Sequence, residues 1–129
     1  MLIDLLASTL EKTGSLGSFW RKLDEGGDAA LAVASSARPF LVAARFSHRP
    51  QPTLAVIAGE DAAVAFARSL AAYIGEEKVL RFYERSDYPF TLQASKPREL
   101  SCRMRASHAL ATGRPCVVVA SARALLRCL

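Results

Sequence analysis

The chain has 129 residues, of which 51% are hydrophobic and 22% charged, with a formal net charge of +5. This length fits one domain with a full core, and the composition is typical of a soluble globular protein. No apolar run could cross a bilayer, no signal peptide is evident, and Cys102, Cys116 and Cys128 lack the paired spacing of a disulfide framework. We therefore expect a cytoplasmic protein with reduced thiols.

Two short helices are predicted at the start of the chain. Apolar residues recur at helical spacing within residues 2–10 and again from Ser15 onward. The second apolar stripe consists of Leu16, Phe19, Trp20 and Leu23. Because Gly26-Gly27 ends this pattern, we expect a helical segment over residues 1–27 and an α/β domain over residues 28–129.

From Asp28 onward, strand patterns alternate with helical patterns. The predicted strands span residues 29–33, 53–58, 79–82 and 116–120. The predicted helices span residues 36–47, 61–74 and 97–112, and a last one follows Ser121, which is expected to cap it. This alternation implies a three-layer α/β fold with a mainly parallel sheet of about four strands. Such sheets bind ligands at the carboxyl ends of their strands.

Two of these helices have a predicted buried face. In the helix over residues 61–74 it consists of Ala63, Phe66, Ala67, Leu70 and Ile74, and Gly75 stands where a left-handed residue is favoured. In the helix that begins near Pro97 it consists of Leu100, Met104 and Ala111, with Arg98 and Arg105 on the opposite face.

The segment after the first predicted strand has the spacing of a phosphate loop but not its residues. A loop of the form GxxxxGK[ST] needs glycines for its turn, a lysine for the phosphates and a hydroxyl for Mg²⁺. Here Ala32 and Ala37 occupy the glycine positions, Arg38 that of the lysine and Pro39 that of the hydroxyl. Pro39 offers neither an amide nor a hydroxyl. Taken alone, the segment fits an ordinary strand-to-helix turn, and it predicts no ATP binding and no cofactor.

The second half of the chain resembles a known family. The residues concerned are Thr53–Ala58, Arg81-Phe82-Tyr83-Glu84, Tyr88, Ser95–Arg103 and, most closely, Gly113–Leu126. They resemble the amino-terminal domain of the bacterial transcription-repair coupling factor (Mfd), and the same region is similar to domain 1a of the excision-repair protein UvrB. The family has Trp-Glu where this chain has Tyr83-Glu84, and its tyrosine falls at Tyr88. The resemblance extends from about Leu16 onward.

The resemblance implies a UvrB-like, degenerate P-loop NTPase-like domain at the start of a longer parent chain. In that family the ATP-dependent DNA translocase motor, which contacts DNA, and the RNA polymerase-binding domain lie further along. The excision-repair protein UvrA is recruited mainly by the domain that follows. The expected function is therefore that of a non-catalytic scaffold domain in transcription-coupled nucleotide-excision repair, whose direct partners are the remaining domains of the parent.

Five residues are candidate contacts with nucleic acid or a partner protein: Tyr83, Tyr88, Arg98, Arg103 and Arg105. Aromatics at a strand end could stack on bases, and arginines could contact phosphates. Packing onto the sheet and a solvated helix face are the commoner roles of such residues. Two alternative functions stay open: an ATP-dependent helicase fragment with an unrecognised loop, and an autonomous nucleic-acid-binding domain. No residue spacing predicts a catalytic group or a metal site.

Overall fold

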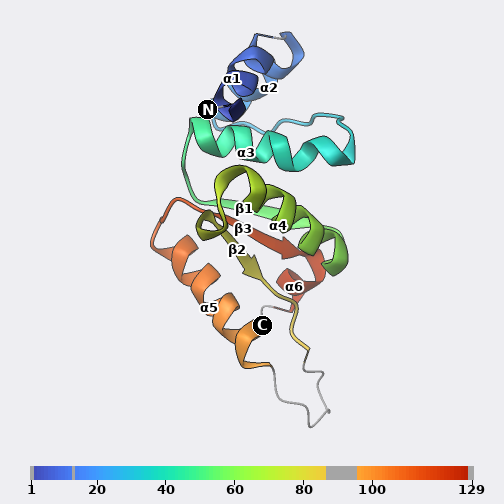
Figure 1. Ribbon diagram of the computed structural model, residues 1–129, viewed down its shortest axis with the longest axis vertical. Coiled ribbons are helices and arrows are strands. Elements are labelled where there is room, and N and C mark those ends of the chain that lie inside the picture. Colours follow the sequence, from blue (N-terminus) through green and yellow to red (C-terminus); the bar gives the residue numbers. More distant parts are fainter. Residues whose placement is uncertain (1, 13, 87–95, 128–129) are drawn as a thin grey trace. The chain divides into compact units, whose positions relative to one another are not determined.

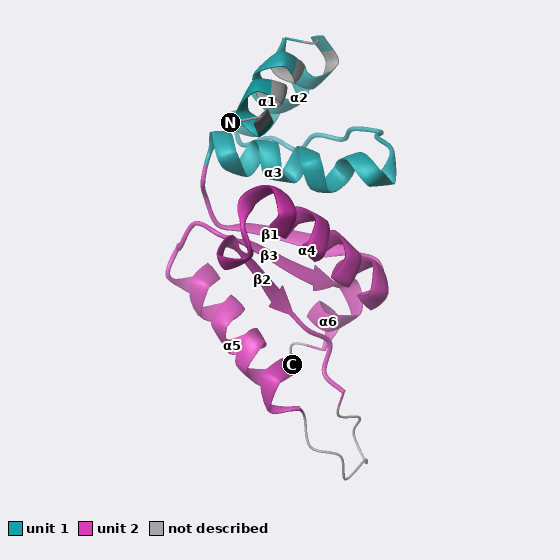
Figure 2. Cartoon of the chain, in the orientation of Figure 1, with its two compact units in different colours: residues 1–49 teal, residues 50–129 magenta. Residues whose placement is uncertain are grey.

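The computed structural model describes residues 2–12, 14–86 and 96–127 (Figure 1). The chain divides into two compact units, unit 1 over Met1–Arg49 and unit 2 over Pro50–Leu129 (Figure 2). The predicted boundary, after residue 27, differs from this one. The difference arises because the helix over Arg38–His48 packs against the first helix of the chain and so belongs to unit 1.

Unit 1 consists of three helices within the described residues. These are α1 (Leu2–Glu11), α2 (Gly14–Asp24) and α3 (Arg38–His48), and α3 follows a short 3₁₀ turn, η1 (Ser35–Ala37). α1 packs against both α2 and α3. The buried hydrophobic residues of unit 1 include Leu16, Ala43, Ala44 and Phe46. The predicted helices over residues 2–10, from Ser15 and over residues 36–47 are thus confirmed, with small shifts at their ends.

The strand predicted over residues 29–33 is wrong. Residues 27–34 have no regular secondary structure, and within them Leu31 and Val33 are half-buried while Ala30 and Ala32 are exposed. Alanine has a weak preference for strands, so an alanine-rich segment needs a neighbouring strand to hold it. The described part of unit 1 contains no such strand. The sheet of the described chain therefore has three strands, against the predicted number of about four.

Unit 2 is built on a parallel sheet. Its strands are β1 (Thr53–Ile57), β2 (Val79–Phe82) and β3 (Val117–Ser121), arranged in the order β1-β3-β2. Both pairings are parallel. β3 lies in the middle, and all five of its residues are buried. The α/β class, the parallel sheet and these three strands are confirmed.

Helices cover both faces of the sheet. α4 (Glu60–Ile74) packs on one face and is joined to β2 by the 3₁₀ turn η2 (Glu76–Lys78). α5 (Pro97–Ala111) and the short α6 (Ala122–Leu126) share a core with the opposite face, to which Leu80 and Phe82 contribute. Since neighbouring strand residues point to opposite faces, Arg81 points toward α4.

The predicted buried face of α4 is confirmed. Ala63, Ala67, Leu70 and Ile74 are buried, and Phe66 is half-buried. Gly75 has a positive φ of 94°, which glycine adopts far more easily than other residues, but its ψ of 146° differs from that of the predicted left-handed cap. The last predicted cap is confirmed as well, because the Ser121 hydroxyl accepts a hydrogen bond from the amide of Ala124 at 3.1 Å.

The predicted buried face of α5 is wrong. Leu100 and Met104 are 52% and 65% exposed, and Ala111 is exposed too. The buried residues are instead Arg103, Ala106 and Ala109. The two alanines let the helix approach the sheet closely, and Arg103 finds a hydrogen-bond partner there.

No helix of the described residues has the length and apolarity that a membrane span requires.

Candidate functional site

The carboxyl ends of the three parallel strands meet at one end of the sheet, which we call the carboxyl edge. β1 leads through Gly59 into α4, β2 leads into residues 83–86, and β3 leads directly into α6. This is the place where parallel sheets commonly bind their ligands. The side chains that gather here therefore decide what the domain can do chemically.

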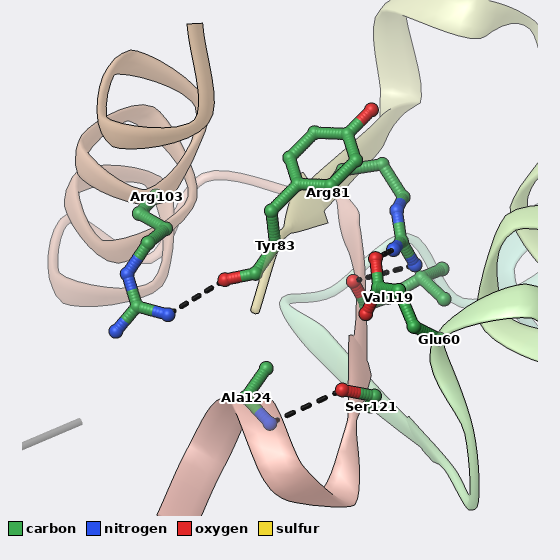
Figure 3. A network of polar contacts seen from close by, with 7 residues as sticks. All are labelled: Glu60, Arg81, Tyr83, Arg103, Val119, Ser121 and Ala124. Carbon is green, nitrogen blue, oxygen red and sulfur yellow. Dashed lines mark hydrogen bonds and ion pairs between the residues drawn. The ribbon is translucent and has the colours of Figure 1, made fainter. Parts of the chain in front are cut away.

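An ion pair between Glu60 and Arg81 joins α4 to β2 at this edge (Figure 3). Arg81 also donates a hydrogen bond of 3.4 Å to the carbonyl oxygen of Val119, and its guanidinium lies 4.8 Å from the centre of the Tyr83 ring. The Arg81 side chain is only 11% exposed and that of Glu60 30%. Arg81 is thus enclosed by groups of the protein itself.

The pair is incompletely hydrogen-bonded. The Oε2 atom of Glu60 and the Nε atom of Arg81 are both buried and have no hydrogen-bond partner among the described residues. A buried charge that lacks part of its hydrogen bonds costs free energy that the ion pair must offset. The pair consequently stabilises the fold less than a fully hydrogen-bonded ion pair would.

Arg103 closes the other side of the edge. This residue is 9% exposed, and its side chain donates a hydrogen bond of 2.6 Å to the carbonyl oxygen of Tyr83. Its guanidinium also lies 4.0 Å from the centre of the Phe82 ring. A carbonyl oxygen just beyond β2 is in this way satisfied by α5 rather than left open to a ligand.

The segment that follows β2 is fastened to both neighbouring helices. Glu84 forms an ion pair with Arg123 of α6 at 3.6 Å. Ser86 donates a hydrogen bond of 2.9 Å to a carboxylate oxygen of Glu99 in α5. Arg127 donates one of 3.4 Å to the carbonyl oxygen of Arg85. The polar groups of residues 83–86 are thus engaged largely within unit 2.

The five predicted contact residues have different positions. Tyr83 is half-buried beside Arg81, and Arg103 is buried in the hydrogen bond described above, so Arg103 holds the fold and is not an exposed contact. Arg98 and Arg105 are exposed on α5, as predicted. Tyr88 lies outside the described residues. The structure brings Tyr83 and Arg103 together, and the two exposed arginines lie elsewhere on α5.

The four positions of the degenerate phosphate loop lie in unit 1, whose described residues contain no strand. Ala32 is exposed in the irregular segment, and Ala37 ends η1 with φ −85° and ψ −17°. Arg38 opens α3 and is exposed, whereas Pro39 is buried in the first turn of that helix. A 3₁₀ turn running into a helix lacks the glycine backbone of a loop that wraps phosphates.

The sequence alone does not predict the Glu60–Arg81 pair, although the position of Arg81 indicates that its charge needs a partner. Arg81 stands between the buried residues Leu80 and Phe82 in β2, and its own side chain is mostly buried. A charge in such a strand requires a partner of opposite sign. Glu60 precedes the predicted helix over residues 61–74 by one residue, so the helical pattern does not include it.

The cysteines and acidic groups of the described chain form no metal centre. Within that part of the chain there is no group of three or more His, Cys, Asp or Glu side chains that could hold an ion. Cys116 is buried next to β3, and this burial raises the pKa of its thiol. The thiol therefore stays protonated and behaves as a small apolar side chain.

The carboxyl edge thus contains an internal ion pair, arginine-to-carbonyl hydrogen bonds and a capped helix start. Its charges are directed at one another, and the phosphate-loop positions lie in the other unit. No protein-family model, no curated protein and no solved structure matches the chain.

Proposed function

We propose that this chain is a non-catalytic scaffold and interaction domain of a transcription-repair coupling factor, acting in the cytoplasm in transcription-coupled nucleotide-excision repair. The proposed family rests on three segments that resemble the amino-terminal domain of the coupling factor, namely Thr53–Ala58, Arg81–Glu84 and Gly113–Leu126. Its support from the fold is limited to the α/β class and the parallel sheet. In this role the domain presents neighbouring domains of the parent chain and carries out no reaction itself.

The observation that carries the non-catalytic role is the closed carboxyl edge. In an enzyme with this type of sheet, the charged residues at that edge face the ligand. Here Arg81 is directed at Glu60 and at the carbonyl of Val119, and Arg103 at the carbonyl of Tyr83. Binding a nucleotide at this edge would require these contacts to break, which favours a structural role.

A titration with a fluorescent ATP analogue and Mg²⁺ tests this role. We expect no saturable binding at micromolar concentrations, because Ala32, Ala37, Arg38 and Pro39 replace the residues that hold phosphates. An intact P-loop protein run in parallel confirms that the assay detects binding. Saturable micromolar binding that unlabelled ATP displaces would contradict the proposal and favour the helicase-fragment alternative.

The assignment to a coupling factor has its own test in the native gene. We expect the coding region beyond Leu129 to continue into a second module, a polymerase-binding domain and a motor with an intact GxxxxGK[ST] sequence. A coding region without such a motor would contradict the assignment of the parent chain to a coupling factor. That outcome would leave the ATP result and the non-catalytic role untouched.

Autonomous nucleic-acid binding is a second candidate, favoured by the exposed Arg98 and Arg105 and by the net charge of +5. It requires affinity for single-stranded DNA that falls steeply with salt and that Arg105→Ala reduces. Tyr83→Ala should also reduce it if that ring stacks on bases. Weak binding that neither substitution changes would exclude this candidate.

A further inference from the structure

The side of α5 that points away from the sheet carries no formal charge. We call it the outward face of α5, and it consists of Pro97, Leu100, Ser101, Met104, Ser107, His108 and Ala111, all of them exposed. A helix at the surface of a globular protein normally places charged and polar residues on this side. Leu100 and Met104, one turn apart, give it an apolar centre.

Positive charge borders this face along one margin. Arg98 and Arg105 are separated by two helical turns, so they lie on the same side of the helix, and both are exposed. Neither forms an ion pair with any of the described residues. The one acidic residue of α5, Glu99, is directed elsewhere, toward Ser86 and Lys96.

We propose that the outward face of α5 binds an acidic amphipathic helix of another protein. Leu100 and Met104 would contact its apolar side chains, and Arg98 and Arg105 its carboxylates. Methionine adapts its shape to apolar partners, and an arginine margin selects an acidic one. This inference deepens the proposed function, because it assigns the interaction role to a defined surface and a partner of defined chemistry.

Two other occupants fit the face less well. A nucleic acid would place phosphates or bases over Leu100 and Met104, whose side chains offer neither charge nor a flat aromatic surface. A second copy of the chain, docked antiparallel by the same face, would bring the arginine margins of both copies together and meet like-charge repulsion, and docked parallel it would leave both margins without an acidic partner. An acidic helix satisfies the apolar centre and the basic margin at once.

The methyl signal of Met104 provides a local probe. The chain contains only two methionines, Met1 and Met104, so a ¹³C-methyl-methionine NMR spectrum is simple, and Met104→Leu assigns the signal. The probe ligand is a synthetic helical peptide with leucines along one face and glutamates beside them. We expect this peptide to shift the Met104 signal saturably, and its lysine-substituted counterpart to bind at least about tenfold more weakly.

Charge reversal sharpens the test. We expect Arg98→Glu combined with Arg105→Glu to invert the preference, so that the lysine peptide binds more tightly than the glutamate peptide. The matched control, Arg21→Glu combined with Arg68→Glu, makes the same charge change at exposed sites on α2 and α4 and should leave the preference unchanged. Leu100→Ser should weaken the binding of the glutamate peptide by at least about fivefold, whereas Val64→Ser on α4 should leave its affinity unchanged.

Three results would overturn the proposal. The first is that neither peptide shifts the Met104 signal, or that both shift it with equal affinity. The second is that a single-stranded DNA oligonucleotide shifts it and the glutamate peptide does not. The third is that dilution of the protein alone shifts it, which would assign the face to a second copy. ATP binding involves other residues, so the failure of this proposal and of the non-catalytic role are distinguishable.

Discussion

Two arginines that lie close together on α5 have different structural roles. Arg103 is buried in α5 and donates a hydrogen bond to the carbonyl of Tyr83, whereas Arg105, two positions later, faces solvent. A buried hydrogen bond from a charged donor contributes more than a neutral one, and its removal leaves the carbonyl without a partner. The long arginine side chain also packs against Phe82.

We therefore expect Arg103→Ala to lower the free energy of unfolding by about 2–3 kcal/mol. Arg105→Ala, the matched control, should change it by less than about 0.5 kcal/mol. Urea unfolding of the two variants, followed by circular dichroism, measures both changes. Equal effects of the two substitutions would mean that Arg103 does not anchor the segment after β2.

The ion pair between Glu60 and Arg81 predicts a different pattern. Arg81→Met leaves a mostly enclosed carboxylate without its partner, so it should lower the free energy of unfolding by about 1–3 kcal/mol. Adding Glu60→Leu removes the stranded charge, and the double variant should be more stable than Arg81→Met alone. This follows because Oε2 of Glu60 and Nε of Arg81 have no hydrogen-bond partner to lose among the described residues.

A double-mutant cycle measures the coupling between these two residues. The same urea unfolding experiment, applied to the wild-type chain, Arg81→Met, Glu60→Leu and the double variant, provides the four free energies. A coupling energy near zero would show that the pair does not persist in solution.

At the scale of secondary-structure elements, the sheet is unevenly buried from its centre to its edge. Val118 in the central strand β3 is fully buried, whereas Val56 in β1 is 51% exposed. Val118→Ala should therefore lower the free energy of unfolding by about 2 kcal/mol, through lost burial and the cavity that remains. Val56→Ala, chemically the same change, should cost less than half as much. Thermal unfolding of the two variants compares them. Equal losses of stability would mean that the outer strand β1 is covered in solution.

The elements that could be predicted from the sequence are those with a strong local pattern. The three strand segments, residues 53–58, 79–82 and 116–120, are mostly apolar and rich in branched side chains. The helix after Asp61 has regular apolar spacing and a glycine at its end. Residues 29–33 match such a pattern in hydrophobicity alone. Their alanines supply little strand preference, so the predicted strand does not form.

The face of α5 and the carboxyl edge could not be predicted because both depend on contacts between distant segments. The hydrophobic pattern predicts that Leu100 and Met104 lie on the buried side of α5. In the structure Ala106 and Ala109 pack against the sheet instead, and Arg103 donates a hydrogen bond to the carbonyl of Tyr83. The pairing of Glu60 with Arg81 likewise exists only once α4 lies over β2. Such pairs are determined by topology, which a local pattern does not contain.

At the scale of the whole molecule, each unit contains its own optical reporter. The one tryptophan of the chain, Trp20, belongs to unit 1, and the three tyrosines belong to unit 2. In unit 1, Asp24 forms ion pairs with Arg45 at 2.5 Å and with Arg49 at 3.1 Å. The Arg45 guanidinium in turn lies 5.5 Å from the centre of the Trp20 ring.

This arrangement predicts an acid-sensitive unit 1. The hydrogen bond from Arg45, helped by nearby positive charges, lowers the pKa of Asp24 below its usual value of 3.8. A lowered carboxyl pKa contributes stability that is present above the unfolded pKa and is lost as the pH falls through the folded one. Below pH 3.8 we thus expect the Trp20 fluorescence to change, and Asp24→Asn to remove this pH dependence.

The near-ultraviolet circular dichroism of the tyrosines is the internal control for this titration. It reports on unit 2, so Asp24→Asn should leave its pH dependence as it is in the wild-type chain. A Trp20 transition that persists unchanged in Asp24→Asn would show that another group controls the acid response of unit 1.

The strand order β1-β3-β2 has a consequence for biosynthesis. β1 and β2 are the first two strands of the sheet to leave the ribosome, yet they do not pair with each other, because each pairs with β3. Until Val117–Ser121 has emerged from the exit tunnel, both nascent strands expose unpaired backbone groups and apolar side chains. The sheet can then form only in a late step, after the chain has been synthesised through β3.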